Sequence, residues 1–406
     1  MANVCQFGQG VSFKMFKTII RTGFLALLVG LSTASAVEKV VPVVPPDQVQ
    51  ALASGVPEIA ANSFLLVDYQ SGSELASYNA SLRVDPASIT KLMTAYVLYR
   101  ELAKGTVKLE DQVLINQGAW EMDGSRMFIE VGKKVELEKL MKGLIIQSGN
   151  DAAIAIAEHV AGSESAYVDK MNQVAVELGM KDTHYSNVTG WPIDNHYTTA
   201  RDIATLAKAI ITEFPDRYKL YSEKEFTYNK IRQYNRNKLL FRDATVDGMK
   251  TGFTDKAGYC LVASAKRQDT RLISIMLGTA SEDARAENSQ KLLEYGFRTF
   301  ETHKMYTANS VLHEARVWKG EDETVPAGVT EDVYISVQKG NYNNLKGAVQ
   351  VSKEIYAPVK RGDVLGQIVF SDQGKVIKQL PLIALADVQE GGMWRQMMDS
   401  VKSWFN

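Results

Sequence analysis

The chain has 406 residues, of which 45% are hydrophobic and 23% are charged, and its formal net charge is −1. These values are typical of globular proteins, and the length suggests roughly two to three domains. A charge this close to neutral gives no support for a nucleic-acid-binding protein. The two cysteines form no C-x-x-C pair and the histidines form no H-E-x-x-H motif, so the sequence predicts no metal site and no cofactor.

The first 36 residues have the features of a secretory signal peptide, with Met15 as an alternative start. A short apolar run follows positive side chains and precedes a small-residue cleavage site: Lys14, Lys17 and Arg21, then residues 23–31 and 34–36. The run is too short to span a bilayer. We therefore predict an exported protein, and the alternative is a buried N-terminal helix. Cleavage would leave Cys260 as the single cysteine, which fits a small buried side chain.

Residues 40–57 are rich in Val and Pro and are predicted to be an extended leader. Two strand patterns around a Gly-containing turn follow at residues 62–78 and predict a hairpin. A helix is then predicted from Ser88 to near Gly105. Because residues three apart share a helix face, Ser88 and Lys91 would project into the same space, as a nucleophile with a candidate base. Taken alone, this S-x-x-K pattern also fits an ordinary helix start with a surface lysine.

Residues 106–298 combine helical patterns with two apolar strands. The polar sequence Ser148-Gly149-Asn150 separates two predicted helices, residues 137–146 and 152–160. Further along the chain, helices are predicted at residues 199–214 and 284–300, and paired central strands at residues 259–265 and 271–278. The Ser148 hydroxyl and the Asn150 amide are therefore expected in a short loop between buried helices.

The C-terminal part has a different pattern. From about residue 299, short β-rich runs are separated by turns and predict an all-β domain, a sandwich, at residues 299–388. The predicted runs are residues 310–318, 333–337, 348–351, 364–370 and 375–382. Residues 389–406 form an amphipathic helix pattern with Trp394 and Trp404 on its apolar side. Such a helix fits the surface of a membrane, so we expect peripheral membrane association through residues 391–406. The alternative is a helix docked on its own domain.

Three short motifs occur in order along the chain: Ser88-x-x-Lys91, Ser148-Gly149-Asn150 and Lys250-Thr251-Gly252. Such a set is typical of penicillin-binding proteins and class A β-lactamases. The flanking residues extend the match at 85–94 (DPASITKLMT), 144–152 (LIIQSGNDA) and 246–252 (VDGMKTG). With these flanks the chain closely resembles the low-molecular-mass penicillin-binding proteins, the D-alanyl-D-alanine carboxypeptidases of the type-5 branch.

The resemblance covers nearly the whole exported chain. It implies an α+β catalytic domain at residues 37–298, with a central antiparallel sheet and helices, followed by the β-sandwich domain and the C-terminal helix. It also implies a serine-type carboxypeptidase that removes the terminal D-alanine from peptidoglycan stem pentapeptides, in cell-wall remodelling and shape maintenance. β-Lactam antibiotics are then expected as inhibitors, and the periplasmic face of the bacterial inner membrane as the location.

The chemistry implied for the motif residues starts at Ser88, which would attack the peptide carbonyl and form an acyl-enzyme. Lys91 would accept the proton, because burial and the like charge of Lys250 lower its pKa. Ser148 would relay a proton toward the leaving amine. Asn150 would hold Lys91 and the substrate amide in place.

The resemblance also assigns substrate contacts. Lys250 and Thr251 are expected to bind the terminal carboxylate, and Gly252 lets the substrate backbone come close to the strand. The family pattern implies an oxyanion hole made by the backbone N–H groups of Ser88 and Phe253.

Five other positions bear on this interpretation. Arg236 and Arg285 are secondary candidates for carboxylate recognition, and each also fits a plain surface arginine. Phe253 stands where related enzymes often have His or another polar residue, which bears on substrate preference and pH dependence. The Glu-x-x-x-Asn spacing of β-lactamases occurs at Glu225 and Asn229, next to a predicted strand, and we interpret it as chance. Slow hydrolysis of a penicilloyl-enzyme is therefore expected, with Lys91 as the base for deacylation as well.

Two alternatives stay open at this point. Within the enzymes, a DD-endopeptidase or a β-lactamase uses the same motifs, although the β domain and the C-terminal helix argue against a free β-lactamase. From another class, the chain fits a penicillin-binding sensor without turnover. The complete set of Ser, Lys and Asn side chains argues against a sensor, because a protein that only binds has no need of a proton relay.

Overall fold

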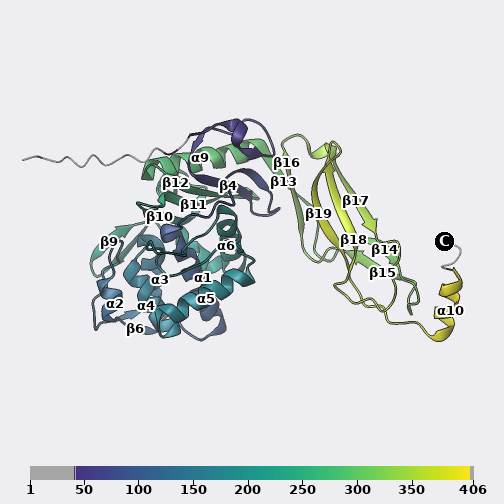
Figure 1. Cartoon of the computed structure of the whole chain (residues 1–406), viewed down its shortest axis with the longest axis horizontal. Helices are drawn as coiled ribbons and strands as arrows, with labels where there is room; N and C mark the ends of the chain where they lie inside the picture. Colours follow the sequence, from purple (N-terminus) through teal and green to yellow (C-terminus); the bar gives the residue numbers. More distant parts are fainter. Residues whose placement is uncertain (1–40, 42, 403–406) are drawn as a thin grey trace, which may run out of the picture. The chain divides into compact units, whose positions relative to one another are not determined.

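The computed structural model describes residues 41 and 43–402, and the predicted signal peptide, with its cleavage site, lies outside them. A six-stranded antiparallel sheet is at the centre of the N-terminal part (Figure 1). In their order across the sheet, the strands are β10 (Val246–Thr254), β11 (Gly258–Arg267), β12 (Thr270–Thr279), β4 (Ser63–Asp68), β5 (Glu74–Tyr78) and β2 (Gln50–Ala51).

Helices cover both faces of this sheet (Figure 1). On one face α9 (Glu282–Thr299) packs on β11 and β12, and Leu261 and Leu292 are buried there. On the other face α6 (Ala200–Glu213) packs on β12 and β4, and Leu65 and Ile275 belong to a larger core. Burial on both faces explains why these central strands are nearly continuous apolar runs.

The N-terminal strands correct one expectation and confirm another. The hairpin predicted at residues 62–78 is formed by β4 and β5. The extended leader predicted at residues 40–57 is wrong in part, because β2 pairs with β5 at the sheet edge and β1 (Val43–Val44) pairs with β3 (Ile59–Ala60). These short pairings satisfy backbone groups that an edge strand would otherwise leave open.

A group of helices is formed by the part of the chain between β5 and β10. It consists of α1 (Lys91–Lys104), α2 (Gln117–Glu121), α3 (Leu137–Lys142), α4 (Asn150–Ala161), α5 (Glu164–Glu177), α6, α7 (Pro215–Tyr218) and α8 (Leu239–Arg242). Two small hairpins lie among them: β6 (Gln112–Leu114) with β7 (Lys134–Glu136), and β8 (Glu225–Tyr228) with β9 (Ile231–Tyr234). As predicted, α1 ends at Gly105, which has the left-handed φ of +74° that favours glycine.

The C-terminal part is all-β, as predicted, and consists of two antiparallel sheets. One pairs β13 (Phe300–Tyr306) with β16 (Val333–Gln338), and the other has the order β14 (Val311–Arg316), β15 (Thr324–Gly328), β19 (Lys375–Ala384), β18 (Val364–Asp372) and β17 (Leu345–Val351). Buried side chains such as Ile335, Ile368 and Leu382 form its own core. Five of these strands, β14, β16, β17, β18 and β19, overlap predicted runs, and β13 and β15 were not predicted.

The last described element is the amphipathic helix α10 (Met393–Lys402). Its Asp399 is buried, and the Asp399 carboxylate accepts a hydrogen bond from the backbone N–H of Lys319 (2.8 Å). Among the described residues, the helices are all too short or too polar to cross a membrane. The domain boundaries 37–298, 299–388 and 389–406 remain predictions.

Candidate active site

Ser88 lies on a tight 3₁₀ turn, Ala87–Thr90, that leads directly into α1. The residue before it, Ala87, has a φ of +48°, in the left-handed region that residues other than glycine rarely adopt. Backbone conformations of this kind are held by their surroundings and cluster at functional sites. The predicted helix therefore begins later, at Lys91, and Ser88 sits at a bend in front of it.

Lys91 is buried beneath this turn, with 1% of its surface exposed. Its Nζ atom lies 2.9 Å from Ser88 Oγ, 2.7 Å from Asn150 Oδ1 and 2.7 Å from the carbonyl oxygen of Thr189. Two of these three neighbours are carbonyl oxygens, which can only accept hydrogen bonds. They take two hydrogens of the amine and leave its third position facing Ser88.

The Ser148-Gly149-Asn150 sequence follows a π-helical turn, Gly143–Gln147. Ser148 is left-handed, with φ +66°, and buried, and Asn150 is the first residue of α4. The Asn150 side chain donates to the carbonyl oxygen of Asp123 (2.6 Å) while its own oxygen accepts from Lys91. The amide is thus held in one orientation, with its oxygen toward the lysine.

The Lys250-Thr251-Gly252 motif lies on β10, across the site from Ser148. Lys250 Nζ donates to Ser148 Oγ (2.8 Å) and to the carbonyl oxygen of Thr251 (2.9 Å). A Cβ atom on Gly252 would lie 3.2 Å from the backbone nitrogen of Ser88. A side chain here would make a tight contact, so glycine lets the strand run this close to the turn that holds the serine without displacing either segment.

The two arginine candidates have different environments. Arg285, at the start of α9, is 3% exposed, and its Nη1 atom donates to the carbonyl oxygen of Gly252 (3.1 Å). Its guanidinium also lies over the ring of Tyr259, 5.6 Å from the centroid. Arg236 is exposed. The alternative of a plain surface arginine is thus wrong for Arg285.

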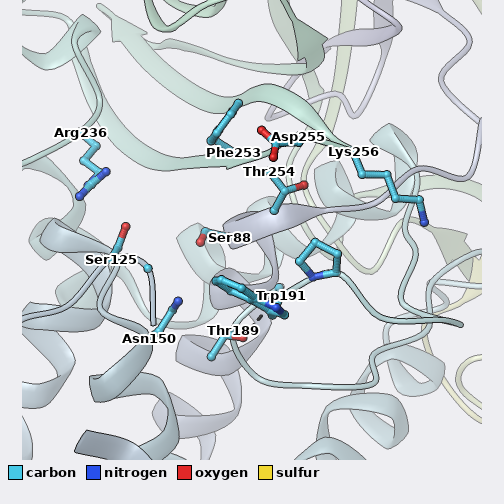
Figure 2. Close-up of a pocket in the computed structure, with 13 residues that line it drawn as sticks. Ser88, Ser125, Asn150, Thr189, Trp191, Arg236, Phe253, Thr254, Asp255 and Lys256 are labelled. Atoms are coloured by element: carbon cyan, nitrogen blue, oxygen red, sulfur yellow. Dashed lines mark hydrogen bonds between the residues drawn. The ribbon is translucent and has the colours of Figure 1, made fainter. Parts of the chain in front are cut away.

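Phe253 follows the motif at the end of β10 and is 46% exposed. Its ring stacks on Tyr259, with 4.2 Å between the centroids. Figure 2 shows Ser88 between Phe253 on one side of a pocket and Trp191 on the other. The residue that departs from the family pattern thus contributes an apolar wall.

Two adjoining cavities open at Ser88. The larger has a volume of about 580 Å³ and includes Asn150, Thr189, Trp191, Arg236 and Phe253 in its lining (Figure 2). The smaller has about 150 Å³ and is lined by Ser88, Ser125, Ser148, Arg236, Thr251, Gly252, Phe253, Tyr259, Glu282 and Arg285. The structure therefore brings the predicted substrate-binding residues around one space, with Lys250 buried in contact with Ser148 and Thr251.

The charges of the two lysines are shifted by their surroundings. Burial lowers the pKa of Lys91 from 10.5 to about 7, with Arg236 acting in the same direction and Asp151 against it. Burial, followed by the positive charges of Lys91, Arg236 and Arg285, lowers the pKa of Lys250 well below its ordinary value. The expected lowering of the Lys91 pKa thus comes chiefly from burial, and the mutual repulsion of the two lysines disfavours the state in which both are charged.

Asp151 supports the structure of the site and was not singled out from the sequence. It is 1% exposed, and its carboxylate accepts hydrogen bonds from the backbone N–H groups of Met127 (3.0 Å), Phe128 (2.9 Å) and Ala152 (2.9 Å). It ties the segment that contains Ser125 to the start of α4. Its position directly after Asn150 was the available signal, because an acidic residue in a first helical turn is a typical N-terminal signature.

Glu225 and Asn229 lie on the β8–β9 hairpin and line neither cavity. Glu225 forms an ion pair with Arg232, and Asn229 donates to Glu130 (3.0 Å). Neither side chain is therefore placed to activate a water at Ser88, which agrees with the interpretation of their spacing as chance.

Comparison with known proteins gives two family matches. Residues 50–281 match the family described as D-alanyl-D-alanine carboxypeptidase, and residues 300–390 match the one described as Penicillin-binding protein 5, C-terminal domain. The D-alanyl-D-alanine carboxypeptidase DacA of Escherichia coli K12 is 42% identical over 366 residues, 88% of this chain and 91% of that protein. DacA of Haemophilus influenzae is 38% identical over 95% of this chain and 97% of that protein.

Solved structures give the same result. Penicillin-binding protein 5 from Haemophilus influenzae has a TM-score of 0.80 at 40% identity, over 83% of this chain and 100% of that chain. Penicillin-binding protein D2 from Listeria monocytogenes, solved in an ampicillin-bound form, has a TM-score of 0.55 at 27% identity, over 59% of this chain and 98% of that chain.

Proposed function

The chain belongs to the D-alanyl-D-alanine carboxypeptidase family, and from this membership we propose how its own residues remove the terminal D-alanine of a peptidoglycan stem pentapeptide. Ser88 is the nucleophile and Lys91 is its base. The observation that carries this assignment is the environment of Lys91 Nζ, which lies 2.9 Å from Ser88 Oγ with its two other neighbours carbonyl oxygens.

The first step is proton removal from Ser88. A neutral lysine has two N–H groups and one lone pair. Asn150 Oδ1 and the Thr189 carbonyl take the two N–H groups, so the lone pair is directed at Ser88 Oγ. A pKa of about 7 provides a large neutral fraction at neutral pH. Ser88 Oγ then bonds to the carbonyl carbon between the two D-alanines, and its proton passes to Lys91.

The negative charge that develops on the carbonyl oxygen is stabilised by the backbone N–H groups of Ser88 and Phe253. Each such donor in an acyl-transfer enzyme typically accounts for roughly 10²–10³-fold in rate. Gly252 allows β10 to approach the Ser88 turn closely enough for two donors to share one oxygen. Phe253 then acts through its backbone, which is why an apolar side chain is tolerated at this position.

The terminal carboxylate of the substrate binds in the smaller cavity. Thr251 supplies a hydroxyl, and Lys250, Arg236 and Arg285 supply positive charge around it. Bringing a carboxylate next to Lys250 favours its protonated form, because an opposite charge raises the pKa of a lysine. Binding of the substrate carboxylate thus promotes protonation of Lys250, the residue that binds it.

The remaining steps pass through the Ser148 hydroxyl, which lies 2.8 Å from Lys250 Nζ. The proton that Lys91 took from Ser88 passes through the Ser148 hydroxyl to the nitrogen of the leaving D-alanine as the peptide bond breaks, so Lys91 is neutral again. Water then attacks the Ser88 ester with Lys91 accepting its proton, and the stem tetrapeptide leaves as Ser88 recovers its hydrogen. β-Lactams acylate the same serine, as the ampicillin-bound structure of the Listeria relative suggests. They are expected to remain bound, because Glu225 and Asn229, which have the spacing of the deacylating element of β-lactamases, line neither cavity.

The location that we propose is the periplasmic face of a bacterial inner membrane. Export rests on the signal-peptide pattern of residues 1–36. Membrane association rests on α10, where Met393 and Trp394 are 90% and 74% exposed. The polar side of this helix is held by Asp399 and by an ion pair between Arg395 and Glu323 (3.1 Å). The apolar side is left for a lipid surface.

The test is D-alanine release from a pentapeptide by the purified protein and by Ser88→Ala. We expect release and covalent penicillin labelling by the wild type, and neither by the variant. Labelling without release would favour the sensor. Rapid turnover of penicillin would favour the β-lactamase, and cleavage of cross-linked peptide dimers in preference to pentapeptide would favour the endopeptidase.

A further inference from the structure

A buried histidine lies behind the turn that carries Ser88. His196 is 4% exposed and lines neither of the two cavities. Its Nδ1 atom lies 3.0 Å from the backbone nitrogen of Ser186, and its Nε2 atom lies 2.8 Å from Thr90 Oγ1. Thr90 Oγ1 lies 2.8 Å from the carbonyl oxygen of Ala87. His196 is thus connected through one hydroxyl to the residue directly before Ser88.

The groups at the two ends set the direction of every hydrogen bond in this chain. The Ser186 N–H can only donate, so Nδ1 of His196 is the acceptor and carries no proton. The proton of the neutral ring is then on Nε2, which donates to Thr90 Oγ1. The Thr90 hydroxyl in turn donates to the Ala87 carbonyl, which can only accept.

The neutral state that this arrangement needs is favoured by the surroundings of the ring. Burial lowers the pKa of His196 to about 4, Lys91 and His184 act in the same direction, and Asp85 acts against it. The ring of Tyr185 packs edge-on against the imidazole, 5.8 Å between centroids. The histidine therefore works as a fixed donor and acceptor rather than as an acid or a base.

The carbonyl at the end of this chain shares a peptide unit with the N–H of Ser88. A peptide unit is planar, so a contact that fixes the Ala87 oxygen also fixes the direction of the Ser88 N–H. The contact is needed because Ala87 has its φ of +48°. Gly190 closes the other side of this oxygen, where a Cβ atom would lie 1.8 Å away.

We infer that His196 is a positioning residue for the oxyanion hole, and that it acts through Thr90 on the Ala87–Ser88 peptide. The Nε2–H···Oγ1–H···O=C sequence orients this peptide. It also polarises it, since a carbonyl that accepts a strong hydrogen bond leaves the N–H of the same amide a better donor. The inference rests on the proposed function, in which the Ser88 N–H stabilises the tetrahedral intermediate.

Four variants of the full-length protein separate this role from simple packing. His196→Leu removes both bonds of the ring, and Thr90→Val removes the hydroxyl with little change in shape. His196→Gln keeps one acceptor for Ser186 and one donor for Thr90. His184→Leu is the control, because this exposed histidine on the same segment bonds to the Asn195 carbonyl instead.

We expect His196→Leu and Thr90→Val each to lower kcat, and the rate constant of β-lactam acylation, by about tenfold with KM unchanged, a part of the roughly 10²–10³-fold that a whole donor contributes. The double variant should be no slower than either single variant, because the two residues act in one chain. His196→Gln should recover most of the rate. The carbonyl stretch of the β-lactam acyl-enzyme should move to higher frequency in the slow variants, because its oxygen receives a weaker hydrogen bond.

Unchanged rates and an unchanged carbonyl band in Thr90→Val would overturn the inference, as would a Gln variant as slow as the Leu variant. Thr90→Val also carries the test where His196→Leu does not fold, which a thermal melt detects. β-Lactam acylation reports on the Ser88 N–H without any release of D-alanine. A wild type that is acylated but releases no D-alanine therefore contradicts the proposed function and leaves the test of His196 intact.

Discussion

The Nζ atom of Lys250 donates a hydrogen bond to the Oγ atom of Ser148 across 2.8 Å, between two residues that are 102 positions apart in the chain. One residue belongs to the central sheet and the other to a turn between helices, and both side chains are buried. The bond therefore joins the two sides of the site through buried side chains. It also connects the Ser148 hydroxyl, which we propose relays a proton, to Lys250, which we propose binds the substrate carboxylate.

The activity should rise with pH through about 7. Lys91 acts as a base only when neutral, and its pKa is lowered to about 7 chiefly by burial. The measurement is kcat/KM for D-alanine release as a function of pH. Lys91→Arg keeps its charge at every accessible pH and should be inactive throughout. A wild-type profile that stays flat across this range would contradict the assignment of Lys91 as the base.

The free energy of unfolding should also rise as the pH increases between about 7 and 10.5. In this window Lys91 is largely neutral in the folded protein, where its pKa is about 7, and protonated in the unfolded chain, where it has its ordinary value of 10.5. The unfolded state thus binds more protons, so raising the pH favours the folded state. Urea denaturation at both ends of the window measures the change. Lys91→Met should show a weaker pH dependence, and an unaltered dependence would contradict the shift.

The two arginines should give different kinds of loss. Arg236→Ala should raise KM without lowering the thermal midpoint, because the side chain is exposed and lines both cavities. Arg285→Ala should raise KM and also lower stability by about 1.5–3 kcal/mol, the range for a hydrogen bond to a charged group, since it removes the bond to Gly252. Arg242→Ala, which loses an ion pair with Asp283 instead (2.6 Å), is the control for both measurements. Equal melting temperatures for Arg236→Ala and Arg285→Ala would contradict the predicted difference in stability.

Phe253→His should leave kcat nearly unchanged, because only the backbone N–H of this residue takes part in the proposed reaction. KM should rise by roughly tenfold, about 1.4 kcal/mol, through loss of apolar contact and of stacking on Tyr259. Steady-state kinetics with pentapeptide separates the two constants. A large fall in kcat with constant KM would show that the ring itself acts in the chemical step.

Replacing Trp394 and Met397 together by Ser should weaken binding to vesicles of anionic lipid. Both side chains are exposed on α10, at 74% and 57%, and each large apolar group that enters a lipid interface contributes about 1.5–3 kcal/mol. The partition coefficient should therefore fall by roughly tenfold or more. Val376→Ser, which changes an exposed apolar residue on β19, is the matched control. Equal flotation of the double variant and the wild type would remove α10 as the anchor.

The parts of the fold that could be predicted from the sequence are those with a strong local pattern. The buried strands β11 and β12 are continuous apolar runs, and α1 ends at a glycine. β15 was not predicted because its five residues, Thr-Val-Pro-Ala-Gly, include a proline and a glycine, which disfavour strands. β2 has only two residues, and its pairing with β5 is a contact between distant segments that no local pattern contains.

The same distinction applies to the site. The motif residues could be predicted because each motif contains a reactive or polar side chain at a fixed position in a short sequence pattern. The left-handed Ala87, the carbonyl of Thr189 and the role of His196 could not, since each depends on a segment roughly a hundred residues away. Burial of Lys91 likewise follows from packing of the whole domain, so the size of its pKa shift was beyond the sequence.

Gly190 and Gly252 both press their backbones against the turn at Ser88, where a Cβ atom would come within 1.8 Å of Ala87 and 3.2 Å of Ser88. A mutation that alters this turn would slow β-lactams and the natural peptide alike, because both react with one serine. A substitution in the turn that confers β-lactam resistance would therefore also lower the carboxypeptidase activity. Selection for resistance in this protein should instead act on Trp191 and Phe253, whose exposed side chains line the larger cavity and can change without moving the nucleophile.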